Sequence, residues 1–391
     1  MPICILIVLL ILSLTCGNAQ EPPRDSILLH PDGSVTFLYK NPDVKSVKVY
    51  CDCKLRKETM TIQSESYHSA KMVKDSASYW SYTTPPLPSE VYTYQFGSDK
   101  RRFPDPTNPD SIRVHRKKMS VFTVGGSSQT DLYHADPLRG HLDTLEFQSR
   151  NEEVVRRITV YTPPQYTDDR RQFPVLYLLH GLNGSETAWI DRGRAAQILD
   201  NLIAQGKAEP MILVMPDANP QCLVAQNENV SLFKNILLYH TWDKMEFEKC
   251  YPEMDSLLSS RYRFSTHAGS RAVAGLSAGA KQSCNLANLY DSTFSSVGLF
   301  SPVVGKKQLP QNTFSQYWIS SGTGDLFRLQ INKFCKKMQL NHIPYTMYSS
   351  AGGHTWRNWR VYFSEYVQTL FWKDWRLNDE AMNDDDTMNE R

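Results

Sequence analysis

A serine between two glycines is the residue of this chain whose setting most directly indicates chemistry. Residues 275–279 read G-L-S-A-G, and the apolar run 271–274 leads into them. This is the pattern of a nucleophile elbow, in which a strand ends, the chain turns sharply at the serine and a helix begins. The two glycines leave room for a crowded turn where a Cβ atom would clash. G-x-S-x-G also arises by chance, so the prediction that Ser277 is a nucleophile depends on its partners.

A serine hydroxyl is a weak nucleophile at neutral pH, so it needs a histidine base that an acid orients. In α/β-hydrolases the order along the chain is Ser, acid, His. Asp291 and Asp325 are the acids between Ser277 and His354. We favour Asp325 because it follows a β-like run, at the edge where open parallel sheets carry their sites. It could also cap the helix expected over 327–341. His354 follows the last expected strand, whereas His342 precedes it.

The tetrahedral intermediate of acyl transfer needs fixed N–H donors for its oxyanion, each worth about 3–4 kcal/mol. The backbone N–H of Ala278, directly after the serine at the start of a helix, is one candidate. The N–H of Leu182 is the second, in the loop H-G-L-N-G at 180–184 that follows a continuous apolar run. We expect His180 to brace this loop rather than to take part in the reaction.

Over residues 143–372 the chain resembles carbohydrate esterase family 1, the branch that holds bacterial feruloyl esterases and acetyl xylan esterases. The matching stretches are P-V-L-Y-L-L-H-G at 174–181, residues 200–204 with 210–216, residues 271–279, and G-G-H-T-W at 352–356 with Trp359 and Arg360. The resemblance implies the same nucleophile, base and acid as the spacing does. Two departures, Ala278 and Ala280 at the elbow and a glycine-poorer oxyanion loop, bear on the acyl pocket.

We therefore expect a serine esterase that acts on ester decorations of plant cell-wall polysaccharide, with feruloyl groups on xylan as the first choice. An acetyl xylan esterase would use the same machinery, and siderophore esterases and acyltransferases share the fold. A carbohydrate-binding surface protein is the non-enzyme alternative, against which the complete Ser-Asp-His order argues. Trp189 and Trp356 are candidates for substrate contact. No cofactor is expected, and no cysteine or histidine spacing is typical of a metal site.

Strand and helix patterns alternate from residue 131 to residue 376, which predicts an α/β fold with an α/β-hydrolase sheet. Strands are expected to begin near Leu142, Arg156, Phe173, Pro210, Arg271, Phe294, Gln316 and Tyr345. Helices are expected at 193–205, 246–261, 278–290, 327–341 and 357–371. The acidic end, 377–391, has little to bury and is predicted to be a disordered tail.

Residues 27–104 alternate apolar and polar in short runs, which favours a small all-β, immunoglobulin-like sandwich. The pattern resembles early-set modules, which are similar to starch-type binding modules. Trp80 and Tyr82 could stack on a sugar, although core packing is the commoner role for Trp80. Prolines from Pro104 onward and glycines at 125–126 predict a linker over 105–130.

The first 19 residues look like a secretory signal peptide cleaved after Ala19, so we expect an exported protein, with a lipoprotein anchored through Cys16 as the alternative. No later segment is long enough to span a membrane. Lys and Arg number 43 against 41 Asp and Glu, which gives no electrostatic case for nucleic acid. Export permits disulfides, but Cys51 and Cys53 are too close in sequence for an easy mutual bridge.

Overall fold

The computed structural model describes residues 26–53, 55, 68–99, 101–114, 117–134, 138–150, 152–167, 171–182, 184–224, 239–305 and 308–371. The predicted signal peptide and acidic tail therefore lie outside the described residues. Within those ranges, no helix has the length and apolar character that crossing a bilayer requires.

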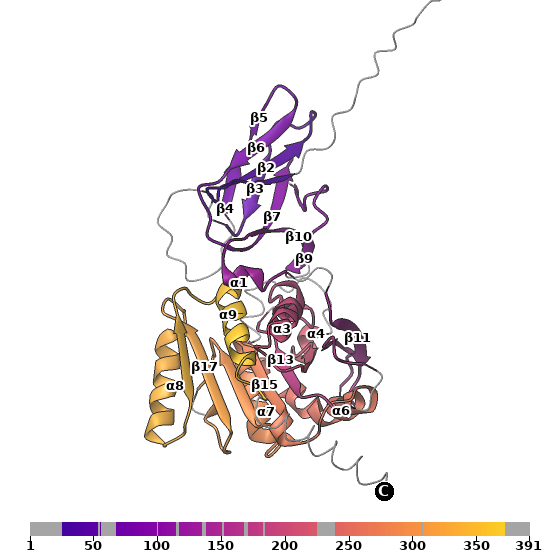
Figure 1. The fold of residues 1–391 in the computed structure, drawn as a ribbon, viewed down its shortest axis with the longest axis vertical. Coiled ribbons are helices and arrows are strands. Elements are labelled where there is room, and N and C mark those ends of the chain that lie inside the picture. Colours follow the sequence, from indigo (N-terminus) through magenta and orange to yellow (C-terminus); the bar gives the residue numbers. More distant parts are fainter. Residues whose placement is uncertain are drawn as a thin grey trace, which may run out of the picture.

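The N-terminal part consists of two antiparallel sheets packed face to face (Figure 1). In the order in which they pair, the strands of the first are β1 (Ile27–Leu29), β2 (Val35–Lys40), β6 (Tyr79–Thr83) and β5 (Val73–Lys74). Those of the second are β4 (His68–Lys71), β3 (Lys48–Cys51), β7 (Glu90–Ser98), β10 (Lys117–Val124) and β9 (Ser111–Val114), with β8 (Arg101–Phe103) also on β7. The buried ring of Phe37 in the first sheet meets Tyr94 and Phe122 of the second, at centroid distances of 5.1 and 5.5 Å. We refer to this part as the sandwich.

The prediction of a linker over 105–130 is wrong. Residues 111–114 and 117–124 are strands β9 and β10, and Phe122 of β10 pairs with Tyr92 of β7. Residues 128–131 form the short helix α1 (Ser128–Asp131). The prolines and glycines that suggested a linker flank these strands, where turns need them, and both faces of β10 are buried.

Core packing, the commoner role expected for Trp80, is confirmed: this residue is only 5% exposed, and its indole N–H donates to the carbonyl oxygen of Asn41 at 3.0 Å. The expectation that Cys51 and Cys53 do not easily form a mutual bridge is wrong. Cys51 and Cys53 form a disulfide across a Cα–Cα distance of 5.1 Å, despite their separation of two residues. Each is at most 1% exposed.

The C-terminal part is built on one eight-stranded sheet, and each of the eight expected strands is present. In spatial order they are β11 (His141–Phe147), β12 (Arg156–Thr162), β14 (Ile212–Pro216), β13 (Val175–Leu179), β15 (Arg271–Leu276), β16 (Ser296–Phe300), β17 (Gln316–Gly322) and β18 (Thr346–Ser350). β11 and β12 are antiparallel, and the strands from β14 to β18 are parallel. The carboxyl ends of six neighbouring strands therefore share one edge, which we call the catalytic edge.

Helices cover both faces of this sheet, because its central strands bury side chains on alternate sides. Leu176 and Leu178 point into the core under α3 and α9, whereas Val175 and Tyr177 point into the core under α6, α7 and α8. The helices are α2 (Ala188–Asp191), α3 (Ala195–Ala204), α4 (Gln221–Val224), α6 (Glu246–Arg261), α7 (Ala278–Leu289), α8 (Arg328–Leu340) and α9 (Trp356–Val367), with 3₁₀ turns η1 (Tyr239–Lys244) and η2 (Ala268–Ser270).

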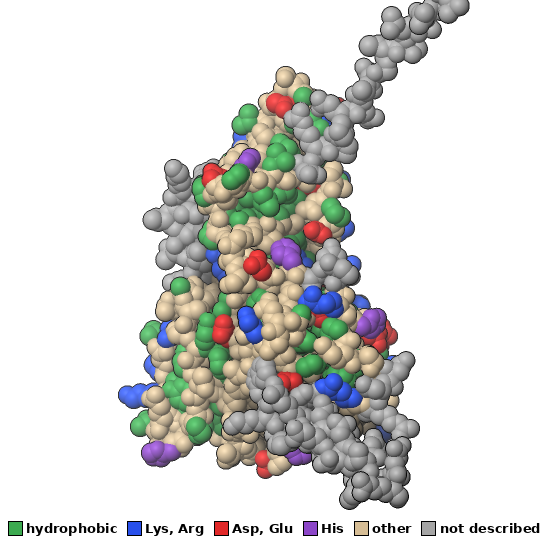
Figure 2. Space-filling view, viewed as in Figure 1, with side chains coloured by type: hydrophobic (Ala, Val, Ile, Leu, Met, Phe, Trp, Pro, Cys, Tyr) green, Lys and Arg blue, Asp and Glu red, His purple; other side chains and the backbone are tan. Residues whose placement is uncertain are grey.

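The sandwich packs against the C-terminal part at the end where the catalytic edge lies, beside the start of α9 (Figure 1). Val91, Ile112, Met119 and Val121 of the sandwich belong to the same buried cluster as the side chains under α3 and α9. The two parts thus share a hydrophobic core. On the face drawn in Figure 2, acidic and basic side chains are interspersed rather than gathered by sign.

A buried carboxyl group on α6 makes stability depend on pH. Glu248 is 1% exposed, and Asn285 of α7 donates a 2.7 Å hydrogen bond to it. Burial raises the pKa of Glu248 from 4.5 to about 7, against the opposing effects of Asn285, Lys281 and Arg156. The folded state therefore binds the Glu248 proton more tightly than the unfolded chain does. The stabilisation that this tighter proton binding gives is lost as pH rises from about 4.5 to 7.

We predict that the Glu248→Gln variant gains free energy of unfolding relative to the wild type as pH rises through this window, by up to roughly 3 kcal/mol. Urea denaturation at half-unit steps of pH measures the difference. Glu146→Gln, at an exposed position, is the matched control and should show no such slope. A difference for Glu248→Gln that does not vary with pH would contradict the prediction.

Candidate active site

Ser277 occupies a strained turn between β15 and α7. Its backbone has φ 53° and ψ −114°, a conformation that residues other than glycine rarely adopt. The N–H of Ser277 donates to the carbonyl oxygen of Phe300 at 2.9 Å, which fixes the turn to the end of the neighbouring strand β16. The serine is 9% exposed. This is the local geometry that the G-x-S-x-G pattern predicts.

The glycines of the elbow are required by close backbone contacts. A Cβ atom on Gly279 would overlap the carbonyl oxygen of His180 and lie 2.7 Å from that of Leu179. A Cβ on Gly275 would lie 2.5 Å from the carbonyl carbon of Gly279. Real Cβ atoms do not approach other atoms so closely, so a larger residue at 279 would push the elbow away from β13, and one at 275 would push the start of α7 away from β15.

The structure brings the three predicted catalytic side chains together. The hydroxyl of Ser277 lies 2.9 Å from Nε2 of His354. Nδ1 of the same ring lies 3.2 Å from both carboxylate oxygens of Asp325. With its proton on Nδ1, His354 donates to the carboxylate and accepts from the serine, which is the arrangement of a general base and its nucleophile.

Asp325 is held as a buried anion. Its side chain is 0% exposed. Burial alone would raise the pKa of Asp325, but hydrogen bonding and charge from His354, with further hydrogen bonds from Ser301 and from the N–H of Phe327, hold it below its usual value. The N–H of Phe327 donates to Oδ1 at 2.9 Å. Asp325 therefore stabilises the turn before α8 as well as contacting His354, but it is not the helix cap, because the N-cap of α8 is Phe327.

The loop that carries His354 is fixed by Asn358, a residue that the sequence analysis did not single out. Its Oδ1 accepts from the N–H of Gly353 at 3.1 Å, and its Nδ2 donates to the carbonyl oxygen of Ala351 at 2.7 Å. The imidazole of His354 lies between the rings of Phe327 and Trp359, at centroid distances of 5.1 and 5.0 Å. The only sequence signal for Asn358 was its position four residues after the histidine, in the first turn of the following helix.

The oxyanion-hole candidates lie on two segments that meet beside Ser277. Ala278 is the first residue of α7. Leu182 follows Gly181, where an added Cβ would lie 3.2 Å from that of Ser277. The imidazole of His180 is buried; its Nδ1 donates to the carbonyl oxygen of Gly181 at 2.8 Å and its Nε2 accepts from the N–H of Ala218 at 3.0 Å. His180 thus braces the loop, while donation by Leu182 and Ala278 stays a prediction.

The structure contradicts the choice of tryptophans for substrate contact. Trp189 is 1% exposed, and its indole N–H donates to the carbonyl oxygen of Leu179 at 3.0 Å. Its ring meets that of Trp356 at 5.2 Å, and Trp356 is itself only 5% exposed. Both side chains pack in the core beneath the catalytic edge, because a large aromatic ring serves a core as well as it serves a sugar.

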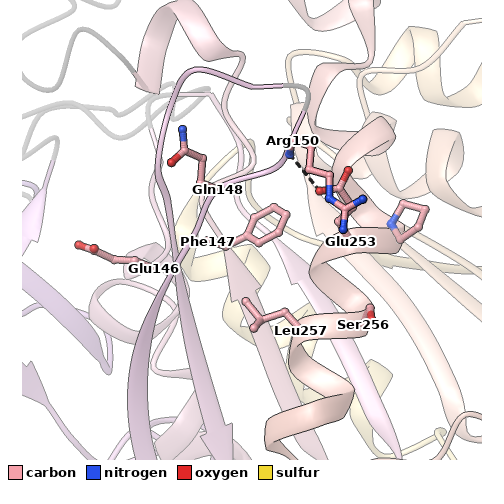
Figure 3. Close-up of a pocket in the computed structure, with 8 residues that line it drawn as sticks. Glu146, Phe147, Gln148, Arg150, Glu253, Ser256 and Leu257 are labelled. Atoms are coloured by element: carbon pink, nitrogen blue, oxygen red, sulfur yellow. Dashed lines mark hydrogen bonds between the residues drawn. The ribbon is translucent and has the colours of Figure 1, made fainter.

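A shallow pocket lies away from these residues, between the end of β11 and α6 (Figure 3). The N–H of Arg150 donates to Glu253 across it at 3.0 Å. None of Ser277, Asp325 and His354 lines it. Among the described residues, no group of three or more His, Cys, Asp or Glu side chains could hold a metal ion.

Comparison with known proteins finds esterases among the relatives of this chain. Residues 149–323 match the model of a family described as "Putative esterase". The chain is 25% identical over 361 residues to an endo-1,4-beta-xylanase/feruloyl esterase of Xylanibacter ruminicola. The match covers 90% of this chain and 47% of the relative, so the chain spans about half the length of that protein.

Solved structures show the same fold at low identity. A ferulic acid esterase of Anaeromyces mucronatus has a TM-score of 0.52 at 21% identity and covers 59% of this chain and 90% of its own. The enterobactin esterase of Shigella flexneri has a TM-score of 0.57 at 15% identity and covers 86% and 92%. The fold is that of an α/β-hydrolase, and the proteins that this chain matches are described as esterases. These likenesses agree with the esterase resemblance drawn from the sequence, and the substrate is a matter of proposal.

We predict that Gly279→Ala lowers kcat at least tenfold and lowers the melting temperature, because the new Cβ must push the elbow away from His180. A misplacement of about 1 Å can cost about 100-fold in rate. Ester hydrolysis assays and thermal denaturation measure both effects. Gly125→Ala is the matched control, since a Cβ there would have no atom within 4 Å. Full activity of Gly279→Ala would show that the crowding at the elbow does not constrain the site.

Proposed function

We propose that the protein is a secreted serine esterase that hydrolyses feruloyl, or more broadly hydroxycinnamoyl, esters on plant cell-wall xylan. The observation that carries the catalytic part is the hydrogen bond of 2.9 Å between Ser277 and His354, with Asp325 behind the imidazole. The xylanase/feruloyl esterase relative supports the substrate. Secretion rests on the signal-like pattern of residues 1–19, cleaved after Ala19.

The proposed reaction proceeds through an acyl-enzyme. The hydroxyl oxygen of Ser277 attacks the ester carbonyl while His354 takes its proton, and Asp325 stabilises the imidazolium. The N–H groups of Leu182 and Ala278 bind the oxyanion of the tetrahedral intermediate. His354 then protonates the departing sugar oxygen, and the C–O bond breaks. Water, deprotonated by the same histidine, attacks the acyl-enzyme, and the free acid leaves as Ser277 regains its proton.

A catecholate siderophore ester is the second candidate substrate. The enterobactin esterase fold covers 86% of this chain, and thus part of the sandwich as well as the C-terminal sheet. That likeness shows the fold alone, because identity is 15%. Acetylated xylan and acyl transfer remain alternatives with the same catalytic groups. A purely carbohydrate-binding role has less support, since Trp80, the aromatic residue first considered for sugar stacking, is buried.

We predict that Ser277→Ala lowers kcat by about five to six orders of magnitude and that Asp325→Asn lowers it by about four. Alanine removes the nucleophile, and asparagine removes the anion that orients and stabilises the imidazolium. Steady-state kinetics with 4-nitrophenyl acetate measure both, and circular dichroism verifies that the variants fold. Asp291→Asn, at the acid not chosen, is the matched control and should keep wild-type kcat. Loss of activity in Asp291→Asn, with activity kept in Asp325→Asn, would reverse the assignment.

We predict that a panel of esters ranks feruloyl substrates first in kcat/KM. The panel contains methyl ferulate, feruloylated arabinoxylan oligosaccharide, acetylated xylan and a 2,3-dihydroxybenzoyl-serine ester. A higher value for the feruloyl oligosaccharide than for methyl ferulate would show that the enzyme also recognises the sugar chain. Preference for acetylated xylan or for the dihydroxybenzoyl ester would replace the proposed substrate while leaving the esterase assignment in place.

A further inference from the structure

A buried glutamate of the sandwich forms ion pairs with the helix that follows the catalytic histidine. Glu90 is the first residue of β7 and is 4% exposed. Its Oε1 accepts from Nη2 of Arg360 at 2.6 Å, and its Oε2 lies 3.1 Å from Nε of Arg357. The N–H of Val91 donates a further hydrogen bond to the same carboxylate, at 2.8 Å. The carboxylate of Glu90 therefore forms ion pairs with two arginines of α9.

The two arginines differ in what they connect. The side chain of Arg360 is 5% exposed, and its Nη1 also donates to the carbonyl oxygen of Arg192, at the end of α2, at 2.6 Å. The side chain of Arg357 is 42% exposed and also donates to the hydroxyl of Tyr92 at 3.2 Å. Arg360 is thus the buried link between the sandwich, α9 and α2. Removal of the Glu90 carboxylate would therefore take a close counter-ion from a buried arginine.

The same helix sets the position of the catalytic imidazole. α9 begins at Trp356, with Thr355 as its N-cap, directly after His354. Asn358, between the two arginines in sequence, holds the backbone of residues 351 and 353. Trp359, beside Arg360, packs edge-on against the ring of His354. A displacement of the first turn of α9 would therefore move the histidine loop with it.

We propose that Glu90 is a positioning residue of the esterase. It fixes the first turns of α9 against the sandwich, so that Nε2 of His354 stays within hydrogen-bond reach of the Ser277 hydroxyl. The inference rests on the proposed catalytic function, and it makes the sandwich a part of the catalytic apparatus rather than a separable binding module. The buried cluster shared by Val91, Val121 and the residues around α9 supports this role.

The test compares two changes at Glu90 in the full-length protein. Glu90→Gln removes the charge at nearly constant shape, and Glu90→Asp keeps the charge but shortens the side chain by one methylene. We expect kcat for 4-nitrophenyl acetate to fall ten- to a hundredfold in Glu90→Gln and several-fold in Glu90→Asp, with KM nearly unchanged. The rate of Ser277 labelling by a fluorophosphonate should fall in parallel, because it also depends on the base. If Glu90→Gln does not fold, the result for Glu90→Asp decides.

Asp255→Asn is the matched control for loss of stability alone. Asp255 pairs with Arg271, at the start of β15 and thus at the sheet edge opposite the elbow. This variant should lose thermal stability but keep wild-type kcat. The inference is overturned if the Glu90 variants melt earlier than the wild type yet keep its kcat and labelling rate. If the wild-type protein is active on 4-nitrophenyl acetate but not on feruloyl esters, only the proposed substrate is overturned. If it is inert to both esters and to the fluorophosphonate, the proposed function and the role of Glu90 are both overturned.

Discussion

The close approach of the Ser277 turn to the end of β13 is the constraint on which the rest of the site depends. The elbow backbone at Gly279 contacts the carbonyl groups of Leu179 and His180 so tightly that no Cβ fits between them. This contact forces Ser277 into a positive φ, and the surrounding sheet must stabilise that strain. In return, the serine projects from the catalytic edge, and the loop at Gly181 lies against it. Nucleophile and oxyanion loop are thus placed by one packing contact.

The acid and the base reach this serine as a preassembled pair. The turn before Asp325 and the loop before His354 are joined by backbone bonds, from Gly324 N–H to the carbonyl oxygen of Gly352 at 2.8 Å and from Thr323 N–H to that of Ser350 at 2.9 Å. These bonds continue the pairing of β17 with β18 beyond the strands. A buried carboxylate costs solvation free energy, which its hydrogen bonds must offset. The backbone frame keeps those partners in place when no substrate is bound.

The sequence predicted the site residues that a local motif and their order along the chain identify. Ser277, Asp325 and His354 follow strands that apolar runs made recognisable, and parallel strands bring their ends to one edge. Long-range packing was not predictable in this way. Trp189 has an aromatic ring of the kind that stacks on sugars, but this ring lies in the core. The strand at 117–124 was missed because prolines and glycines mark a hairpin turn as readily as a linker. Glu90 and Arg360 are 270 residues apart, and no local pattern links them.

The shared core limits how the substrate can reach the serine. Separable domains meet through modest, rather polar interfaces and move relative to one another. Here Ile112 and Met119 of the sandwich are buried in the same cluster as Tyr362 of α9, so separating the two parts would expose apolar side chains. The sandwich is therefore fixed beside the catalytic edge, where it takes up part of the space around the start of α9 (Figure 1). A substrate must approach Ser277 along the side of the edge that the sandwich leaves open. The sandwich therefore limits the space beside the start of α9, although Ser277, Asp325 and His354 all come from the C-terminal part.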